Sequence, residues 1–471
     1  MFRLLGYAPK RARAAAVAVL RIETELANVS MPKEDVRDVE KTYHKKTIEE
    51  LARRSPVVNW KRYLRAIGAG APSSLIVSQP KFMEESGRLL SSAPLSDWKE
   101  YLRFHVANSS ASLLSDTFVR AQFDFYAKAL MGNKRMKPLW RRVLRVVNGN
   151  LGDALGKLYV ARHFSPHAKR EVGRLVDNLF IAYEERVRNL DWMSVLTKKK
   201  AIAKLRMMTR KLGYPKRFKT YRGLVIRPDD YFGNAVRAGK HHLRREMRKL
   251  KKPVDRTEWF MSPQTVNAYC NFNMNEIVFP AAILQPPFFD ADADDAVNYG
   301  AIGSVIGHEI THALDDQGSK FDGKGTMRRW WTPRDRKRFD AKGRRLIRQF
   351  DAYKVAPDMP VNGRLTLGEN IADLGGTAIA LDAYIRSLKR AGKRTVGGFT
   401  PEQRFFLGLA QAFREIVRPE FLKTMVTTDP HSPEEFRVNG PASNSEAFYE
   451  AFGVTKKDKL YRKPSDRAKI W

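Results

Sequence analysis

Cysteine is almost absent from this chain, which has one cysteine, Cys270, among its 471 residues. A single cysteine cannot form an internal disulfide, so no covalent cross-link holds the fold together. Free cysteine is among the most buried residue types. We therefore expect Cys270 to be a small buried residue rather than a reactive thiol.

Long hydrophobic runs are also lacking, and no stretch approaches the roughly 20 apolar residues that span a bilayer. The opening MFRLLGYAPKRARAAAVAVLRIE superficially resembles a signal peptide, because a basic flank precedes the apolar run from Ala14 to Leu20. Arg21 and Glu23 follow that short run at once. We therefore expect a helix here and no export signal.

Negative charge is in deficit, with 86 Lys and Arg against 51 Asp and Glu, a net charge of +35. Such a surface favours acidic peptides, anionic surfaces or nucleic acid as partners, but does not predict a fold. The basic residues are dispersed, with dense patches such as HHLRREMRKLKK at 241–252. No zinc-finger, helix-turn-helix or RNA-binding signature accompanies them. We expect no specific nucleic-acid partner, and contact with an anionic surface stays open.

The hydrophobic content of 43% is sufficient for a sizeable core. The pattern to about residue 230 is helical, and the segment 212–232, rich in Gly, Pro and charge, predicts a linker. We predict two domains, 1–230 and 231–471. Strands are expected near 266–269 and 277–279, so the fold class is mainly α with a small β-sheet (α+β).

One short motif carries metal chemistry, GHEITHALDD, from Gly307 to Asp316. His308 and His312 are four residues apart, so a helix presents both rings on one face, where they can bind one metal ion. Glu309 lies one step round the helix, which suits a base acting on water at the metal better than a ligand. The pattern His-Glu-x-x-His also arises by chance, so a third ligand must decide.

The best third ligand is in LGENIADLGG, from Leu367 to Gly376. Glu369 and Asp373 are four apart and face the same way on a helix. Glu369 can bind zinc, and Asp373 can accept a hydrogen bond from the outer nitrogen of a ligand histidine. A solvated acidic face is the alternative, but the apolar residues around this pair predict a buried helix.

A third polar stretch is TTDPHSPEEFRVNG, from Thr427 to Gly440, which contains Asp429, His431 and Arg437. The flanking prolines fix the local backbone, so His431 can be held rigidly. A cation or hydrogen-bond donor beside the metal stabilises an oxyanion. On the sequence alone, an isolated Asp-Pro-His in a turn is more often structural than functional.

The chain resembles the neprilysin family of zinc metalloendopeptidases. The resemblance rests on four motifs in that family's order, and it extends upstream to VNGNLGDALGKLYV and LRIETELANVS. The four motifs are VNAYCNFNMNEIVFPAAILQPPFF (266–289), YGAIGSVIGHEITHALDDQG (299–318), LTLGENIADLGG (365–376) and DPHSPEEFRVNG (429–440). The resemblance implies a thermolysin-like catalytic domain at 231–471 and a helical lid domain at 1–230.

The resemblance implies a role for each matching residue. It makes His308, His312 and Glu369 the ligands of one zinc ion, Glu309 the general base, and Asp373 the residue that orients His308. His431, oriented by Asp429, steadies the tetrahedral oxyanion. The resemblance also implies six residues that bind the peptide substrate. Asn267 and Ala268 lie on an edge strand, and Arg437 contacts the carbonyl beyond the scissile bond. An apolar pocket for the next side chain is lined by Ile283, Phe288 and Val305.

The resemblance thus implies a zinc metalloendopeptidase that cleaves oligopeptides before apolar residues, in an extracytoplasmic location. This chain begins inside the family's helical domain, so only part of the lid is expected. The alternative is a truncated relative that binds zinc or peptide without turnover.

Overall fold

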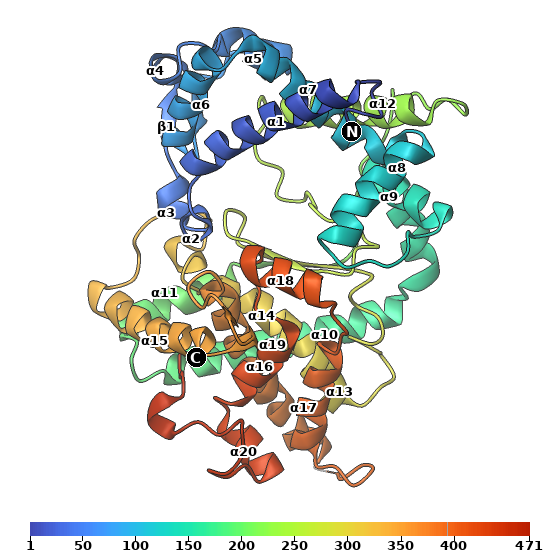
Figure 1. Ribbon diagram of the computed structural model, residues 1–471. Helices are drawn as coiled ribbons and strands as arrows, with labels where there is room; N and C mark the ends of the chain where they lie inside the picture. Colours follow the sequence, from blue (N-terminus) through green and yellow to red (C-terminus); the bar gives the residue numbers. More distant parts are fainter. Residues whose placement is uncertain (393) are drawn as a thin grey trace. The chain divides into compact units, whose positions relative to one another are not determined.

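The computed structural model describes residues 1–392 and 394–471 and is mainly helical with small sheets, which confirms the predicted fold class (Figure 1). The chain divides into two compact units. Unit 1 comprises residues 1–151 and 221–255, and unit 2 comprises residues 152–220 and 256–471. This division differs from the boundary predicted at residue 230, because helices after residue 151 pack into the core of unit 2.

Unit 1 is a set of helices around a small apolar cluster of Phe2, Ala12, Ala15 and Val19. Its one two-stranded sheet pairs β1 (Lys45–Thr47) antiparallel with β2 (Ser74–Ile76). Its helices are α1 (Pro9–Val29), α2 (Lys33–Val36), α3 (Val39–Thr42), α4 (Ile48–Arg54), α5 (Trp60–Ala66), α6 (Pro80–Ser92), α7 (Leu95–Ser110), α8 (Asp116–Gln122), the start of α9 (Leu139–His163) and α12 (Tyr231–Lys249). The division between the units falls at Leu151, where α9 has non-helical backbone angles.

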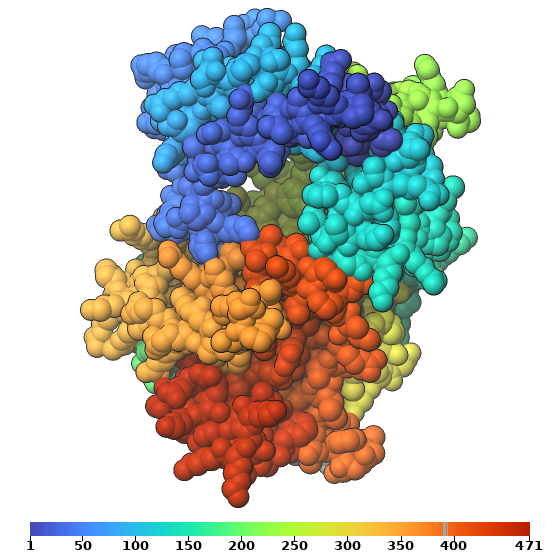
Figure 2. Space-filling view, in the orientation of Figure 1, coloured from blue at the N-terminus to red at the C-terminus, as the bar shows by residue number. Residues whose placement is uncertain are grey.

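Unit 2 contains the predicted motifs. A three-stranded sheet has the order β3-β5-β4, with β3 (Thr209–Gly213) parallel and β4 (Tyr269–Asn271) antiparallel to the central β5 (Glu276–Pro280). A second small sheet pairs β6 (Lys354–Ala356) with β7 (Met359–Pro360). The helices are α10 (Pro166–Asn189), α11 (Val195–Arg206), α13 (Asp295–Asn298), α14 (Ser304–His312), α15 (Pro333–Asp351), α16 (Leu367–Ala391), α17 (Pro401–Ala412), α18 (Pro419–Thr428), α19 (Glu434–Ala442) and α20 (Glu446–Phe452). On the face in Figure 2, the C-terminal segments, coloured orange to red, form most of the visible surface of this unit.

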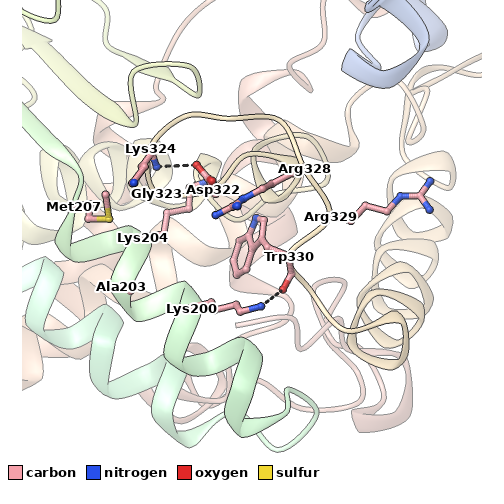
Figure 3. Close-up of a pocket in the computed structure, with 10 residues that line it drawn as sticks. All are labelled: Lys200, Ala203, Lys204, Met207, Asp322, Gly323, Lys324, Arg328, Arg329 and Trp330. Carbon is pink, nitrogen blue, oxygen red and sulfur yellow. Dashed lines mark hydrogen bonds and ion pairs between the residues drawn. The ribbon is translucent and has the colours of Figure 1, made fainter.

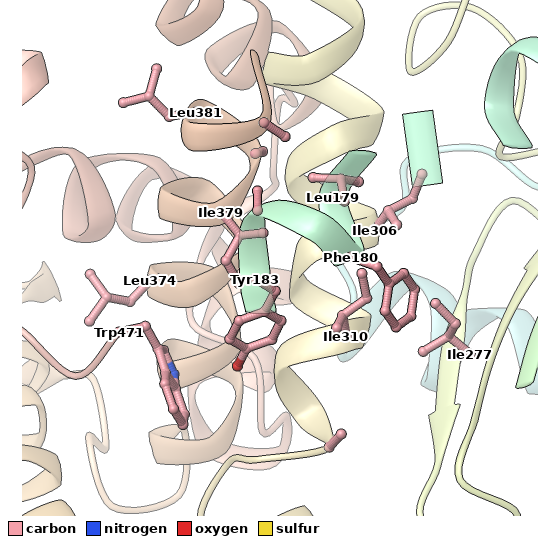
Figure 4. Packing of buried hydrophobic residues seen from close by; sticks show 14 of the residues in the cluster. Leu179, Phe180, Tyr183, Ile277, Ile306, Ile310, Leu374, Ile379, Leu381 and Trp471 are labelled. Atoms are coloured by element: carbon pink, nitrogen blue, oxygen red, sulfur yellow. The ribbon is translucent and has the colours of Figure 1, made fainter. Parts of the chain in front are cut away.

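The core of unit 2 lies around α14, which packs against α10 and α16 (Figure 4). Ile306 and Ile310 on α14 are fully buried there. The C-terminal Trp471 belongs to the same core, and its ring centroid is 5.9 Å from that of Tyr183. An apolar helix is thus surrounded by other helices, which fixes the direction of its few polar side chains. None of the helices in the described ranges is long and apolar enough to cross a membrane.

Candidate metal centre

The two motif histidines lie on a helical segment that runs from α13 through a π-helical turn, η3 (Tyr299–Gly303), into α14. Asp294 begins it by accepting a hydrogen bond from the Ala296 amide. The wider π turn passes against α17, where a Cβ on Gly300 would collide with the carbonyl oxygen of Phe405. Such turns recur at functional sites, and this one lies just before the motif.

Two glycines set the distance between the helices that carry the candidate metal ligands. A Cβ on Gly307 of α14 would lie 2.7 Å from the carbonyl oxygen of Gly376 on α16. A Cβ on Gly376 would lie 2.5 Å from the backbone nitrogen of His308. The two backbones therefore touch, and this contact brings Glu369, in the first turn of α16, to the histidines of α14.

Three imidazole nitrogens surround one carboxylate oxygen. Glu369 Oε2 lies 3.2 Å from His308 Nε2, 3.3 Å from His312 Nε2 and 3.2 Å from His431 Nε2. The Nε2 atoms of His308 and His312 are 2.9 Å apart. His308, Glu369 and His431 also meet the spacing of a metal-binding group. The predicted ligands and the predicted oxyanion residue therefore converge on one point.

This donor set fits a zinc ion. Tetrahedral ligands at about 2.0–2.1 Å from zinc lie roughly 3.3 Å from each other, close to the separations found here. Glu369 Oε2 is buried and accepts no hydrogen bond from the described part of the chain. A buried carboxylate oxygen without a donor needs a cation, and imidazole nitrogens with a carboxylate are ligands that zinc prefers.

Each histidine is held at its outer nitrogen by a carboxylate. His308 Nδ1 lies 2.7 Å from Asp373 Oδ1, and His431 Nδ1 lies 2.8 Å from Asp429 Oδ1, which are the two pairs that the sequence predicts. His312 Nδ1 lies 2.7 Å from Asp315 Oδ2, a pair that we did not predict. For His308 and His312, such partners fix both the ring orientation and the tautomer that leaves Nε2 free for a metal.

Arg437 is bound to Asp373 through two hydrogen bonds. Its Nε and Nη2 each donate to a different oxygen of Asp373 at 2.8 Å. Its guanidinium also lies over the ring of Phe413, 4.9 Å from the centroid. Burial alone would raise the pKa of the Asp373 carboxyl, but Arg437 and His308 hold it far below its usual range. Asp373 therefore stays ionised beside His308.

The carboxyl of Glu309 is buried beside the histidines, and burial raises its pKa although His308 and His312 act in the opposite direction. A raised pKa brings a carboxylate closer to the range useful for a general base. Burial lowers the pKa of His431, but its carboxylate partners Asp429 and Glu369 raise it to about 10.

The loop that carries His431 is tied to the helix that carries Glu369. Ser432 Oγ donates to Asn370 Oδ1 at 2.7 Å, and both side chains are almost fully buried. Asn370 in turn donates to Thr366 Oγ1 at 2.8 Å. Ser432 and Asn370 directly follow His431 and Glu369 in the chain, but this adjacency does not predict that the two segments meet.

The predicted substrate-binding residues fall into two groups. The edge strand begins at Tyr269, so Asn267 and Ala268 lie just before β4 rather than within it, and Asn267 Oδ1 accepts from the Ala268 amide at 2.8 Å. β4 is nonetheless an edge strand, as predicted. Ile283, Phe288 and Val305 belong to or pack against the main core, Ile283 fully buried and the other two half-buried.

A mainly helical fold thus brings two histidines and a glutamate from two packed helices together in a donor set that fits zinc. The chain belongs to peptidase family M13, whose family models match residues 1–215 and 267–468. This agrees with the resemblance found in the motifs.

Known relatives cover nearly the whole chain. It is 34% identical to an endothelin-converting enzyme homolog of Locusta migratoria, over 99% of this chain and 67% of the relative. It is 36% identical to endothelin-converting enzyme 1 of Rattus norvegicus, over 92% and 59%. The structure of Mycobacterium tuberculosis zinc metalloprotease Zmp1 with an inhibitor matches with a TM-score of 0.96 at 43% identity, over 99% and 72%. The chain thus spans 59% to 67% of the length of these two curated relatives.

Proposed function

We propose that this chain is a zinc-dependent metalloendopeptidase that hydrolyses oligopeptides. The observation that supports it most directly is the convergence of three imidazole nitrogens on Glu369 Oε2 within 3.3 Å. Membership of peptidase family M13 names the reaction class. We infer zinc as the metal because the similar Zmp1 structure is of a protein described as a zinc metalloprotease.

We assign the zinc to His308, His312 and Glu369. The ion would act as a Lewis acid, polarising the scissile carbonyl and lowering the pKa of a water at the site. Asp373 and Asp315 keep protons on the outer nitrogens of the two rings, so their inner nitrogens stay available as donors. A zinc ion held by these three protein ligands would keep one position open, which is the arrangement of catalytic rather than structural sites.

Glu309 takes the proton from the attacking water and passes it to the leaving amine. Its burial and raised pKa support this role. His431 donates a hydrogen bond from Nε2 to the oxyanion of the tetrahedral intermediate. The support is its position, because Asp429 holds His431 Nδ1 at 2.8 Å and this places Nε2 3.2 Å from Glu369 Oε2, beside the proposed zinc ion.

The substrate is held by its backbone. We propose that Asn267 and Ala268, at the start of the edge strand, pair with the peptide by strand addition. Arg437 would contact the carbonyl beyond the scissile bond while Asp373 fixes its guanidinium. Ile283, Phe288 and Val305 supply apolar surface for the next side chain, so cleavage before apolar residues is expected. We assign unit 1 to the family's helical lid.

The first experiment compares wild-type chain and Glu309→Gln on a quenched fluorescent peptide with an apolar residue after the scissile bond. Wild type should cleave it, and a chelator should stop cleavage. Glu309→Gln should bind one zinc per chain but lose roughly 10²–10⁴-fold in kcat. If zinc-loaded wild type cleaves no peptide, the proposal is wrong and the chain is a relative that binds zinc without turnover.

A second experiment separates the metal ligands from the oxyanion residue. His312→Ala should lose the zinc, whereas His431→Ala should retain one zinc per chain and lose kcat with little change in KM. The opposite pattern of zinc contents would show that His308, Glu369 and His431 form the ligand set, which their spacing also permits. Metal analysis after gel filtration measures both.

We infer that the chain works outside the cytosol, because a mouse relative 34% identical to it is named membrane metallo-endopeptidase-like 1. The basic surface would then face anionic surfaces there. Fractionation of the source cells tests this inference. Recovery of the protein only with cytosolic markers would contradict it.

A further inference from the structure

A buried lysine supports the end of the helix that carries the two histidines. Lys204 on α11 is only 2% exposed. Its Nζ donates to the carbonyl oxygens of Ala313 at 2.6 Å, Gly318 at 2.7 Å and Phe321 at 2.6 Å. An ammonium group has three hydrogens, so all of them are used on backbone oxygens.

The first two carbonyls belong to the turn that follows His312. Ala313 directly follows the last residue of α14, where helix carbonyls lack partners inside the helix and attract a cation. The Gly318 amide donates to Asp315 Oδ1 at 2.6 Å, while Asp315 Oδ2 holds His312 Nδ1 at 2.7 Å. One ammonium therefore fixes both ends of the turn that carries Asp315.

The backbone of Lys204 is itself fixed. Asn275, which is also buried, donates from Nδ2 to the carbonyl oxygens of Lys204 and Gly323, each at 3.0 Å. Asn275 has a positive φ of 47° and lies just before the central strand β5. The lysine thus projects from a rigid base toward the metal helix.

Burying a cation in this position costs desolvation free energy. Among the described residues no carboxylate lies within ion-pair distance of Lys204 Nζ, and desolvation by burial lowers the pKa of Lys204 to about 8. An apolar side chain of similar length would fill the same space without this penalty. What only the ammonium supplies is three directed hydrogen bonds, and all three end on the segment 313–321.

We propose that Lys204 is a positioning residue of the metal site, which holds Asp315 and thereby the His312 ring in the orientation that binds zinc. This inference rests on the proposed function for the identity of the metal. It concerns metal affinity and not turnover, so it is measured without a substrate.

Lys204 is reachable from solvent through its stem, because it lines a pocket of about 340 Å³ together with Lys200, Ala203, Met207 and Trp330 (Figure 3). Truncating the side chain to alanine therefore joins the vacated space to this pocket. The removed atoms are three methylene groups and the ammonium, which correspond to n-propylammonium. That ion can enter the pocket and replace the missing donor.

The experiment measures cobalt and zinc affinity of the full chain by competition with a chromophoric chelator. The visible spectrum of bound cobalt reports the coordination geometry. Lys204→Ala should bind both metals roughly 10–100-fold more weakly, the usual effect of losing a partner of a metal ligand. Millimolar n-propylammonium should restore affinity and spectrum, whereas 1-propanol at the same concentration should not.

Lys200→Ala is the matched control, because Lys200 lies one turn earlier on α11 and lines the same pocket. Among the described residues its Nζ donates only to the Trp330 carbonyl, at 3.3 Å, and Figure 3 draws this hydrogen bond. It should bind cobalt like wild type, with no response to the amine.

Lys204→Met covers the case in which the alanine variant does not fold, because methionine keeps most of the side-chain volume. Weaker metal binding by Lys204→Met, with wild-type circular dichroism, supports the proposal. Wild-type affinity and an unchanged cobalt spectrum in this variant overturn it. If the wild-type chain binds neither metal, the proposed function itself has failed, which is a separate result.

Discussion

Replacing Gly376 with alanine should force apart the two helices that carry the proposed metal ligands. The added Cβ would lie 2.5 Å from the His308 backbone nitrogen and 2.6 Å from the Ser304 carbonyl oxygen, whereas ordinary contacts are 3.4–4 Å. Both neighbours are backbone atoms of α14, so no side chain can rotate away. The helices must therefore separate locally by about 1 Å.

That displacement is large on the scale of metal coordination, where ligand distances are held to roughly ±0.2 Å. Glu369 lies on the displaced helix and the histidines lie on the other, so we expect zinc affinity to fall at least about 10-fold. Overpacking should also lower the free energy of unfolding by about 1–3 kcal/mol. Competition with a chelator measures the affinity, and thermal unfolding of the metal-free chain measures the stability.

Gly173→Ala is the control, because Gly173 lies in α10 of the same unit and a Cβ there would meet nothing within 4 Å. This change should leave zinc binding unaltered and raise stability by up to about 1 kcal/mol, the ordinary gain from replacing a helical glycine. If Gly376→Ala binds zinc like wild type and melts at the same temperature, backbone contact does not set the ligand spacing.

Three further changes are expected to have measurable effects. Asp315→Asn should weaken zinc binding roughly 10–100-fold in a chelator competition, because the His312 ring loses its carboxylate; unaltered affinity would remove Asp315 from the site. Asp335→Asn should lower the free energy of unfolding by about 1–3 kcal/mol at pH 7, because it weakens buried hydrogen bonds from Ser194 and Thr197. Burial raises the pKa of Asp335, but these hydrogen bonds hold it below its usual value. The stability that the ionised carboxylate contributes is therefore present above about pH 4, and it is lost as the pH falls through the lower pKa of the folded state. Urea titrations at pH 7 and pH 3 should show a smaller effect of the substitution in acid, and an equal effect would contradict this. Deleting Trp471 should cost about 3–5 kcal/mol, because its ring is buried in the core, and an unchanged melting temperature would exclude that role.

The sequence predicted much of the fold of unit 2, because its strongest signals are local. Apolar residues around the His308 motif and the Glu369 motif predicted two buried helices, and these are α14 and α16. The strand predicted at 277–279 is the central strand β5. The parallel strand β3 was missed, because Leu212 and Gly213 were assigned to a linker and its pairing with β5 is non-local. The edge strand starts three residues later than predicted.

The predicted domain boundary followed composition, and composition does not report packing. The segment 212–232 has the glycine, proline and charge of a linker, and the passage from unit 2 to unit 1 at residue 221 does lie within it. The chain crosses between the units twice more, at residue 151 and residue 255, without a comparable signal. The first crossing lies inside the long helix α9, and a helical pattern continues across it.

Side-chain spacing predicted that Glu369 and Asp373 face the histidines of α14, but it did not predict the contact between the His431 loop and α16. The four-residue spacing of Glu369 and Asp373 indicated that one could bind a metal while the other held a histidine, and Asp373 does lie against His308. Asp315 has the same kind of signal, since it follows His312 by three residues and lies against its ring. The hydrogen bond between Ser432 and Asn370 had no such signal, because it joins two segments whose contact depends on the whole core.

The close approach of α14 and α16 depends on two glycines, and the sequence alone does not predict this role for them. Gly307 and Gly376 each occur within a predicted motif, and each removes the Cβ that would separate the backbones. A glycine inside a helix normally destabilises it by about 1 kcal/mol relative to alanine. Here the loss is offset by close packing that brings Glu369 Oε2 to 3.2 Å from His308 Nε2. The spacing of the metal ligands therefore depends on residues that have no side chain to bind anything.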